Sequence, residues 1–159
     1  MKTKLVAVSL LRAVLLVGTA ALLSPATGRA ADAAKSVVIV ANDTLRFDVT
    51  EITASPGETL HVQLKNQGTL PKAVMGHNWI LLDSNSEASA YVMAAASGAA
   101  QNYEPKALTA HVLASIPLLG PKETGTVTFT APSRPGKYPF LCSFPGHFQA
   151  GMHGELIVK

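Results

Sequence analysis

The chain has 159 residues, of which 48% are hydrophobic and 14% charged, with 13 Lys and Arg against 10 Asp and Glu. This length suits one globular domain with one sizeable core. Four of the basic residues and none of the acidic ones lie in residues 1–30, which leaves nine basic against ten acidic residues in the remainder. No cluster of Lys and Arg survives there, so binding of nucleic acid is not expected.

Residues 1–30 have the layout of a secretory signal peptide. A basic start is followed by an apolar run over 14–23, and small residues precede a cleavage point after Ala30. The alternative is a membrane anchor, but the run is shorter than the ~20 residues that span a bilayer. We expect export, removal of residues 1–30, and a single domain over 31–159 with no membrane span.

Short segments with β-branched residues or with alternating apolar and polar residues follow, separated by Gly and Pro. These patterns are typical of β-strands. The expected strands are 36–41, 45–49, 59–64, 78–82, 110–115, 126–130, 138–142 and 154–158. Seven or eight short strands with turns between them predict an all-β Greek-key β-sandwich.

Residues 83–103 differ from the rest of the chain. They are rich in Ala and Ser and poor in β-forming residues, and either Asp83 or Ser84 could cap a helix. We predict a short helical flap laid on the β framework.

Four side chains are candidate metal ligands, three of them near the C-terminus and one in the middle of the chain. Cys142 is the only cysteine, so it cannot form an internal disulfide, and His147 and Met152 follow it within eleven residues. With His77 they supply one thiolate, two imidazoles and one thioether, the donors of a blue-copper site. The alternatives are a buried structural thiol for Cys142 and simple core packing for Met152.

Two motifs resemble one family closely. Residues 70–81 (LPKAVMGHNWIL) and 142–147 (CSFPGH) resemble the two copper-binding segments of azurins, and 97–130 is similar to azurins as well. Azurins place three residues between the loop histidine and the methionine, whereas four separate His147 from Met152 here, as in plastocyanin and the auracyanins. The chain is identified as an azurin-like member of the cupredoxin family with an auracyanin-like ligand loop.

The resemblance implies a metal site with defined roles. It implies one type 1 copper ion per chain, held by His77, Cys142 and His147 with Met152 as a weak axial ligand. The Gly76 carbonyl is a candidate fifth contact, which the longer loop leaves open.

The resemblance also implies residues that support the ligands. Asn78 would tie the two ligand segments together, the alternative being a plain turn residue. The backbone N–H groups of Asn78 and Phe144 would point at the Cys142 sulfur, where donors stabilise thiolate charge. Asn66 stands where some azurins carry a titrating histidine.

These expectations converge on an exported, periplasmic one-electron carrier that cycles between Cu(I) and Cu(II). Redox partners would meet it transiently at an apolar collar around the His147 edge, which comprises Met75, Pro145, Phe148 and Ala150. The alternative is a periplasmic copper-binding or trafficking protein. An enzyme is not expected, because His61, His111 and His153 do not form a second metal centre in the sequence pattern.

Overall fold

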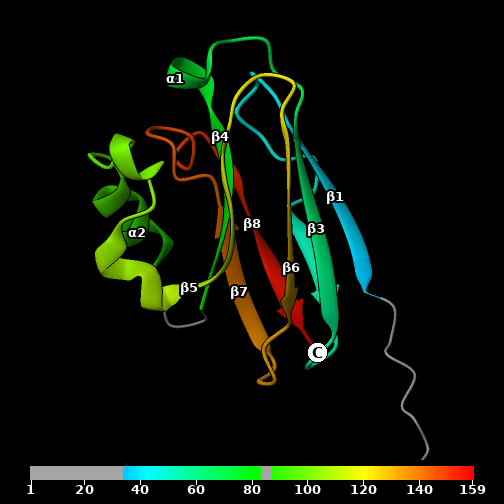
Figure 1. Ribbon diagram of the computed structural model, residues 1–159. Coiled ribbons are helices and arrows are strands. Elements are labelled where there is room, and N and C mark those ends of the chain that lie inside the picture. The colour runs from blue at the N-terminus through cyan, green and yellow to red at the C-terminus, as the bar shows by residue number, and fades with distance from the viewer. Residues whose placement is uncertain (1–33, 84–86) are drawn as a thin grey trace, which may run out of the picture. The chain divides into compact units, whose positions relative to one another are not determined.

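A computed structural model describes residues 34–83 and 87–159 of the chain (Figure 1). The predicted signal peptide lies outside these described residues, and the boundary after Ala30 stays a prediction. Among the residues that the structure describes, we find no helix with the length and apolar character that crossing a bilayer requires.

Within the described residues, eight strands form two sheets. The strands are β1 (Lys35–Ala41), β2 (Glu51–Ala54), β3 (Thr59–Asn66), β4 (His77–Leu82), β5 (Val112–Leu119), β6 (Thr124–Thr130), β7 (Gly136–Leu141) and β8 (His153–Val158). One sheet has the order β1-β3-β6 and the other β2-β8-β7-β4-β5 (Figure 1). The predicted all-β sandwich is therefore confirmed.

The core lies between the sheets and follows from alternation along the strands. In β3, Leu60, Val62 and Leu64 are fully buried while the residues between them are partly exposed. At its centre the rings of Trp79 and Phe140 lie 5.5 Å apart. Each large apolar side chain buried in this way contributes about 1.5–3 kcal/mol to folding. This core supports the ligand-bearing ends of β4, β7 and β8.

The predicted strand over 45–49 is wrong. Leu45 has a φ of 58°, which ends any extended run there. The segment forms a single β-bridge to β1, between Ala41 and Phe47, and Asp48 hydrogen-bonds to Val40 beside it. A leucine side chain gives no signal for this left-handed conformation. The strand comes later, as β2, whose residues pair in parallel with β8, Glu51 opposite Glu155.

The predicted helical flap is confirmed, with different boundaries and a different start. It contains α2 (Ala88–Ala95), η1 (Ala99–Gln101) and η2 (Lys106–His111), and a separate short helix, α1 (Lys72–Met75), precedes β4. The N-cap of α2 is Glu87, which makes no side-chain cap bond. The predicted cap Asp83 instead faces His111, with Oδ2 3.0 Å from Nδ1. The other predicted cap, Ser84, lies outside the described residues.

A second, smaller cluster joins the flap to the sandwich. Tyr91 and Val92 of α2 are buried against Ile80, Leu82 and Leu141. The flap therefore covers the outer face of β4 and β7, on which Ile80, Leu82 and Leu141 lie.

Candidate metal centre

His77 begins β4, and the glycine before it fixes how the chain enters the strand. A Cβ at Gly76 would lie 2.7 Å from the Lys72 carbonyl oxygen and 2.8 Å from Leu118 Cγ, closer than real side chains come. Only glycine lets α1 pack this tightly against β5. His77 then pairs with Leu119 across the sheet, and its ring is fully buried.

Residues 142–152 form a loop that closes on itself. The Cys142 N–H donates to the Met152 carbonyl and the Met152 N–H donates to the His147 carbonyl, both at 3.0 Å. Gly146 and Gly151 have φ values of 84° and 103°, a backbone conformation that favours glycine. The loop thus places three predicted ligands on one short, internally bonded stretch.

The structure brings three of the predicted ligands together. The ligand atoms of His77, Cys142 and His147 all lie within 4.8 Å of one another, with Cys142 Sγ 3.4 Å from His147 Nδ1. The three residues are 0%, 0% and 3% exposed. Met152 is also fully buried and belongs to the same core cluster as Cys142. Gly76 is buried, and its role as a carbonyl contact stays a prediction.

Burial favours the neutral form of both imidazoles. Neither ring nitrogen of His77 has a hydrogen-bond partner. Burial lowers the pKa of His77, against a weaker opposite effect of Asp43 and the Asn42 backbone, and burial followed by repulsion from His77 lowers the pKa of His147 to about 4. A buried nitrogen without a partner costs about 1–3 kcal/mol. A bound metal cation removes that cost, so these residues fit a metal ion.

The thiol of Cys142 lies in surroundings that resist its ionisation. Burial raises the pKa of Cys142 to about 12, while the backbone N–H groups of Asn78 and Phe144 lower it in part by donating to the sulfur. These are the two N–H groups that the family resemblance implied would point at this sulfur. A soft cation beside the sulfur supplies the remaining charge that a thiolate needs, and one buried thiol with two imidazoles suits copper.

Asn78 ties the two ligand segments together, as predicted. Its Oδ1 accepts from the Ser143 N–H at 2.8 Å, and its Nδ2 donates to Ser143 Oγ at 2.8 Å. These bonds join the residue after His77 to the residue after Cys142. The alternative of a plain turn residue is excluded, since Asn78 is fully buried.

Sequence reasoning missed that the flap belongs to the same network. Asn78 Nδ2 also donates to the Asn102 carbonyl at 3.2 Å, and Ser143 Oγ donates to the Tyr103 carbonyl at 2.7 Å. Asn102 and Tyr103 have positive φ values of 53° and 61°, an uncommon conformation for residues other than glycine. The acceptors are backbone carbonyls, which every residue type has. The sequence therefore held no signal for these hydrogen bonds.

Asn66 also has a structural role close to the ligands. Its Nδ2 donates to the Leu119 carbonyl at 3.2 Å, and its Oδ1 accepts from the Gly68 N–H at 2.8 Å. Leu119 is the residue that pairs with His77. The side chain at this position is therefore a buried amide that holds the loop before α1 and carries no charge.

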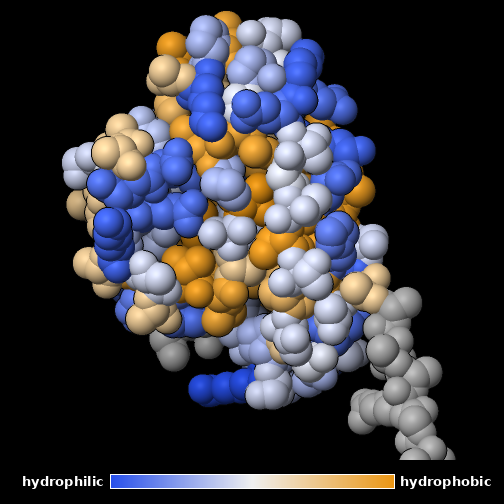
Figure 2. Space-filling view, viewed as in Figure 1, coloured by the Kyte–Doolittle hydropathy of each residue, from blue (hydrophilic) through white to orange (hydrophobic). Residues whose placement is uncertain are grey.

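The predicted collar is only partly exposed. Pro145 is exposed, whereas Met75, Phe148 and Ala150 are half-buried, and Phe148 also packs against the cluster beneath α2. His147 itself lies just under the surface. The apolar surface also includes Leu70 and Val74, which are 41% and 61% exposed and which the sequence reasoning missed. Figure 2 shows hydrophobic side chains exposed around α1.

The remaining histidines take no part in the cluster. His61 contacts Thr128 Oγ1, His111 contacts Asp83, and the ring of His153 lies 4.9 Å from that of Phe148. His153 is exposed although the preceding Met152 is buried, as expected for neighbours on a strand.

Residues 34–159 match the family described as copper binding proteins, plastocyanin/azurin family. Auracyanin-A of Chloroflexus aurantiacus is 40% identical over 117 residues, which cover 72% of this chain and 68% of that protein. Azurin-1 of Alcaligenes xylosoxydans xylosoxydans is 41% identical over 124 residues, which cover 76% of this chain and 95% of that protein. Among solved structures, auracyanin A of Chloroflexus aurantiacus, described as a "blue" copper protein, superposes with a TM-score of 0.69. That match has 35% identity and covers 80% of this chain and all of the other.

Proposed function

The chain belongs to the plastocyanin/azurin family of copper binding proteins, and from this membership we infer its work as a blue-copper electron carrier. It carries single electrons between redox partners and is not an enzyme. Its cofactor is a type 1 copper ion at the cluster of His77, Cys142 and His147, with Met152 beside it.

We propose the individual roles of the ligands. His77, Cys142 and His147 hold the copper ion, one per chain, and Met152 is its weak axial ligand, with the Gly76 carbonyl as a candidate further contact. The observation that carries this proposal is the buried cluster of donor atoms within 4.8 Å of one another, in which the ring nitrogens of His77 have no other partner. Copper bound there supplies the Cu(I)/Cu(II) couple, to which mixed nitrogen and sulfur donors are suited.

The protein's own contribution is to hold the donors still and keep water away. The Asn78 and Ser143 side chains fix the two ligand segments to each other and to the flap. The N–H groups that face Cys142 stabilise negative charge on its sulfur. Ligands held in this way need little rearrangement when an electron arrives or leaves, which favours fast transfer.

Burial of the ligands argues against the alternative of copper trafficking. A protein that hands copper on must present its ligands to another protein. His77 and Cys142 are fully buried here and His147 is only 3% exposed. Electrons cross such a thin protein layer easily, whereas a metal ion does not.

We further propose where the carrier works and how partners meet it. The leader over residues 1–30 supports export to the periplasm, where it would be removed. The exposed and half-buried apolar residues around His147 support transient docking there, since His147 lies closest to that surface among the ligands. Small, weak interfaces of this kind are typical of electron-transfer partners.

Optical and EPR spectra of the copper-loaded mature protein test the ligand assignment. We expect one copper per chain, an intense blue or green-blue band that a reductant bleaches, and an EPR signal of a copper–thiolate centre. A colourless copper complex, or binding of more than one ion with equal strength, would overturn the assignment. N-terminal sequencing of the protein from a periplasmic fraction tests the location, and a start at Met1 would contradict it.

A further inference from the structure

Arg46 lies against the ligand loop although it comes from a different part of the chain. It stands in the turn between β1 and β2 and is exposed. The place that a Cβ at Gly151 would occupy is 3.0 Å from both Cζ and Nη1 of Arg46. The guanidinium therefore packs on bare backbone at the residue just before Met152, where a side chain would otherwise be.

The guanidinium has most of its hydrogen-bonding capacity free. Its Nη1 donates to the Leu45 carbonyl at 2.9 Å, which is one of five N–H donors. The ion pairs found among the described residues, such as Lys137 with Glu155 at 2.8 Å, do not include Arg46. Arg46 is therefore a cation without an ion-pair partner among the described residues, and it packs against the loop that carries His147 and Met152.

Such a group complements the apolar surface around His147. An apolar patch gives binding energy but little control over orientation, whereas one well-placed charge fixes the register of two proteins. Arginine suits this task because its planar fork binds a carboxylate through two parallel hydrogen bonds. Arg46 contacts Gly151, which follows His147 by four residues in the same loop. The fork therefore lies against the loop that carries His147.

We propose that Arg46 is a docking anchor for a redox partner that presents Asp or Glu carboxylates beside its own redox centre. This inference rests on the proposed function, because it takes the loop around His147 as the place of electron exchange. After loss of the leader, nine basic and ten acidic residues leave a net charge close to zero. The long-range field is therefore weak, and Arg46 acts at short range, within a Debye length of ~10 Å at 0.1 M salt.

The test compares electron transfer to the oxidised copper protein from two small reductants of opposite charge. The iron(II)–EDTA dianion carries carboxylates and gives up one electron to become the iron(III) complex, and hexaammineruthenium(II) is a dication that also gives one electron. The variants are Arg46→Gln and Arg46→Glu. Arg134→Gln is the matched control, since Arg134 is also exposed and lies in the turn between β6 and β7, at the opposite end of β7 from Cys142.

We expect Arg46→Gln to slow the iron–EDTA reaction at least about threefold at low ionic strength, and Arg46→Glu to slow it further. The ruthenium reaction should become faster in the same variants, and Arg134→Gln should change neither rate. The visible spectrum should stay constant, and the reduction potential of each variant is measured so that rates are compared at equal driving force. Added salt should remove the differences.

Two results would overturn the proposal. One is an effect of Arg46→Gln no larger than that of Arg134→Gln. The other is a change of the same sign with both reductants, or an altered visible spectrum, either of which would make Arg46 a support of the copper site and not a docking group. The wild-type protein distinguishes failure of this proposal from failure of the proposed function. A wild type that accepts electrons from neither reductant would contradict the function itself.

Discussion

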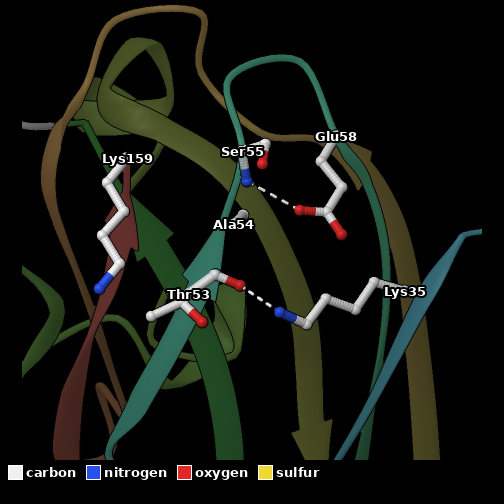
Figure 3. A pocket seen from close by; sticks show the side chains of 6 residues that line it. All are labelled: Lys35, Thr53, Ala54, Ser55, Glu58 and Lys159. Atoms are coloured by element: carbon white, nitrogen blue, oxygen red, sulfur yellow. Dashed lines mark hydrogen bonds between the residues drawn. The ribbon is translucent and has the colours of Figure 1, made fainter.

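The two ends of the sandwich differ in whether their polar side chains are buried or exposed. At the ligand end, His77, Asn78, Ser143 and His147 are at most 3% exposed, and the side chains of Asn78 and Ser143 are hydrogen-bonded to each other. At the other end, a shallow pocket of about 170 Å³ is open to solvent (Figure 3). Its lining residues are Lys35, Thr53, Ala54, Ser55, Glu58 and Lys159.

The polar groups at the pocket end satisfy one another locally and remain in contact with water. The Lys35 ammonium donates to the Thr53 carbonyl, and the Ser55 N–H donates to the Glu58 carboxylate at 2.8 Å. Exposed contacts of this type add little to stability. Buried polar groups, in contrast, must each find a partner. Buried polar groups in this fold are therefore concentrated at one end, where a bound cation supplies the missing partner. Substitutions at the two ends should for this reason have unequal effects.

The largest effect is expected from Cys142→Ala. Loss of the sulfur should abolish the intense visible band completely, because that band arises from charge transfer between thiolate and copper. Absorption and EPR spectra of the copper-loaded variant measure this. Lys159→Gln, at the pocket end, is the control and should keep the full band. A blue Cys142→Ala protein would show that the donor assignment is wrong.

Asn78→Ala should cause the largest loss of stability among the supporting residues. Asn78 makes three hydrogen bonds, to Ser143 N, Ser143 Oγ and the Asn102 carbonyl. At about 0.5–1.5 kcal/mol for each bond, with a further cost for the orphaned Ser143 N–H, we expect a loss of about 2–4 kcal/mol in the free energy of unfolding.

Denaturant unfolding of the metal-free protein measures this loss. Lys137→Ala breaks the exposed pair with Glu155 at the other end and should change the unfolding midpoint very little. Equal losses for the two variants would mean that the ends of the molecule do not differ in the way we describe.

Met152→Leu should leave the colour and change the reduction potential. A thioether donates weakly, and its removal disfavours Cu(II) relative to Cu(I). Each tenfold loss of relative Cu(II) affinity raises the potential by about 59 mV, and we expect a rise of at least that size in voltammetry. An unchanged potential together with an unchanged EPR spectrum would assign Met152 to the core alone.

The smallest effect is expected from charge placed in the collar. Ala150→Asp should slow electron self-exchange about tenfold, because two facing carboxylates must lose water and repel each other. NMR line broadening measures the rate, and the visible spectrum should not change. Phe148→Asp should act in the same direction but also lower stability, since Phe148 packs against the cluster under α2.

Ser133→Asp, in the turn between β6 and β7, is the control for the collar variants and should exchange at the wild-type rate. The wild-type rate itself should depend only weakly on salt, because residues 31–159 hold nine basic and ten acidic residues. Equal rates in all these proteins, or a steep salt dependence in the wild type, would show that electron exchange takes place at a surface other than the collar.

The sequence was informative where chemistry depends on side-chain identity. The spacing of Cys142, His147 and Met152 and the segment around His77 pointed to the cluster that the structure assembles, and the family likeness pointed to the role of Asn78. The sequence was uninformative where backbone conformation decides. Leu45 gives no sign of its positive φ, so the strand over 45–49 was wrongly predicted and β2 was missed.

Other features depend on contacts that only the folded chain reveals. The tie between Ser143 and the flap uses the carbonyl of Tyr103, and any residue has a carbonyl. The packing of Arg46 on Gly151 depends on two turns that lie about a hundred positions apart in the chain. Patterns of hydropathy and residue type report local structure and cannot register such pairs.

The pairing of β8 with both β2 and β7 determines when the metal site can exist during folding. Glu51 lies opposite Glu155, so the second strand of the domain pairs with the last, about a hundred residues later in the chain. Domains with such distant contacts fold slowly, in milliseconds to seconds. Met152 directly precedes β8, and the closure of the Cys142 loop through the Met152 carbonyl depends on it. A chain emerging in order from a ribosome or a translocation channel therefore cannot assemble its copper ligands until almost the whole domain has emerged.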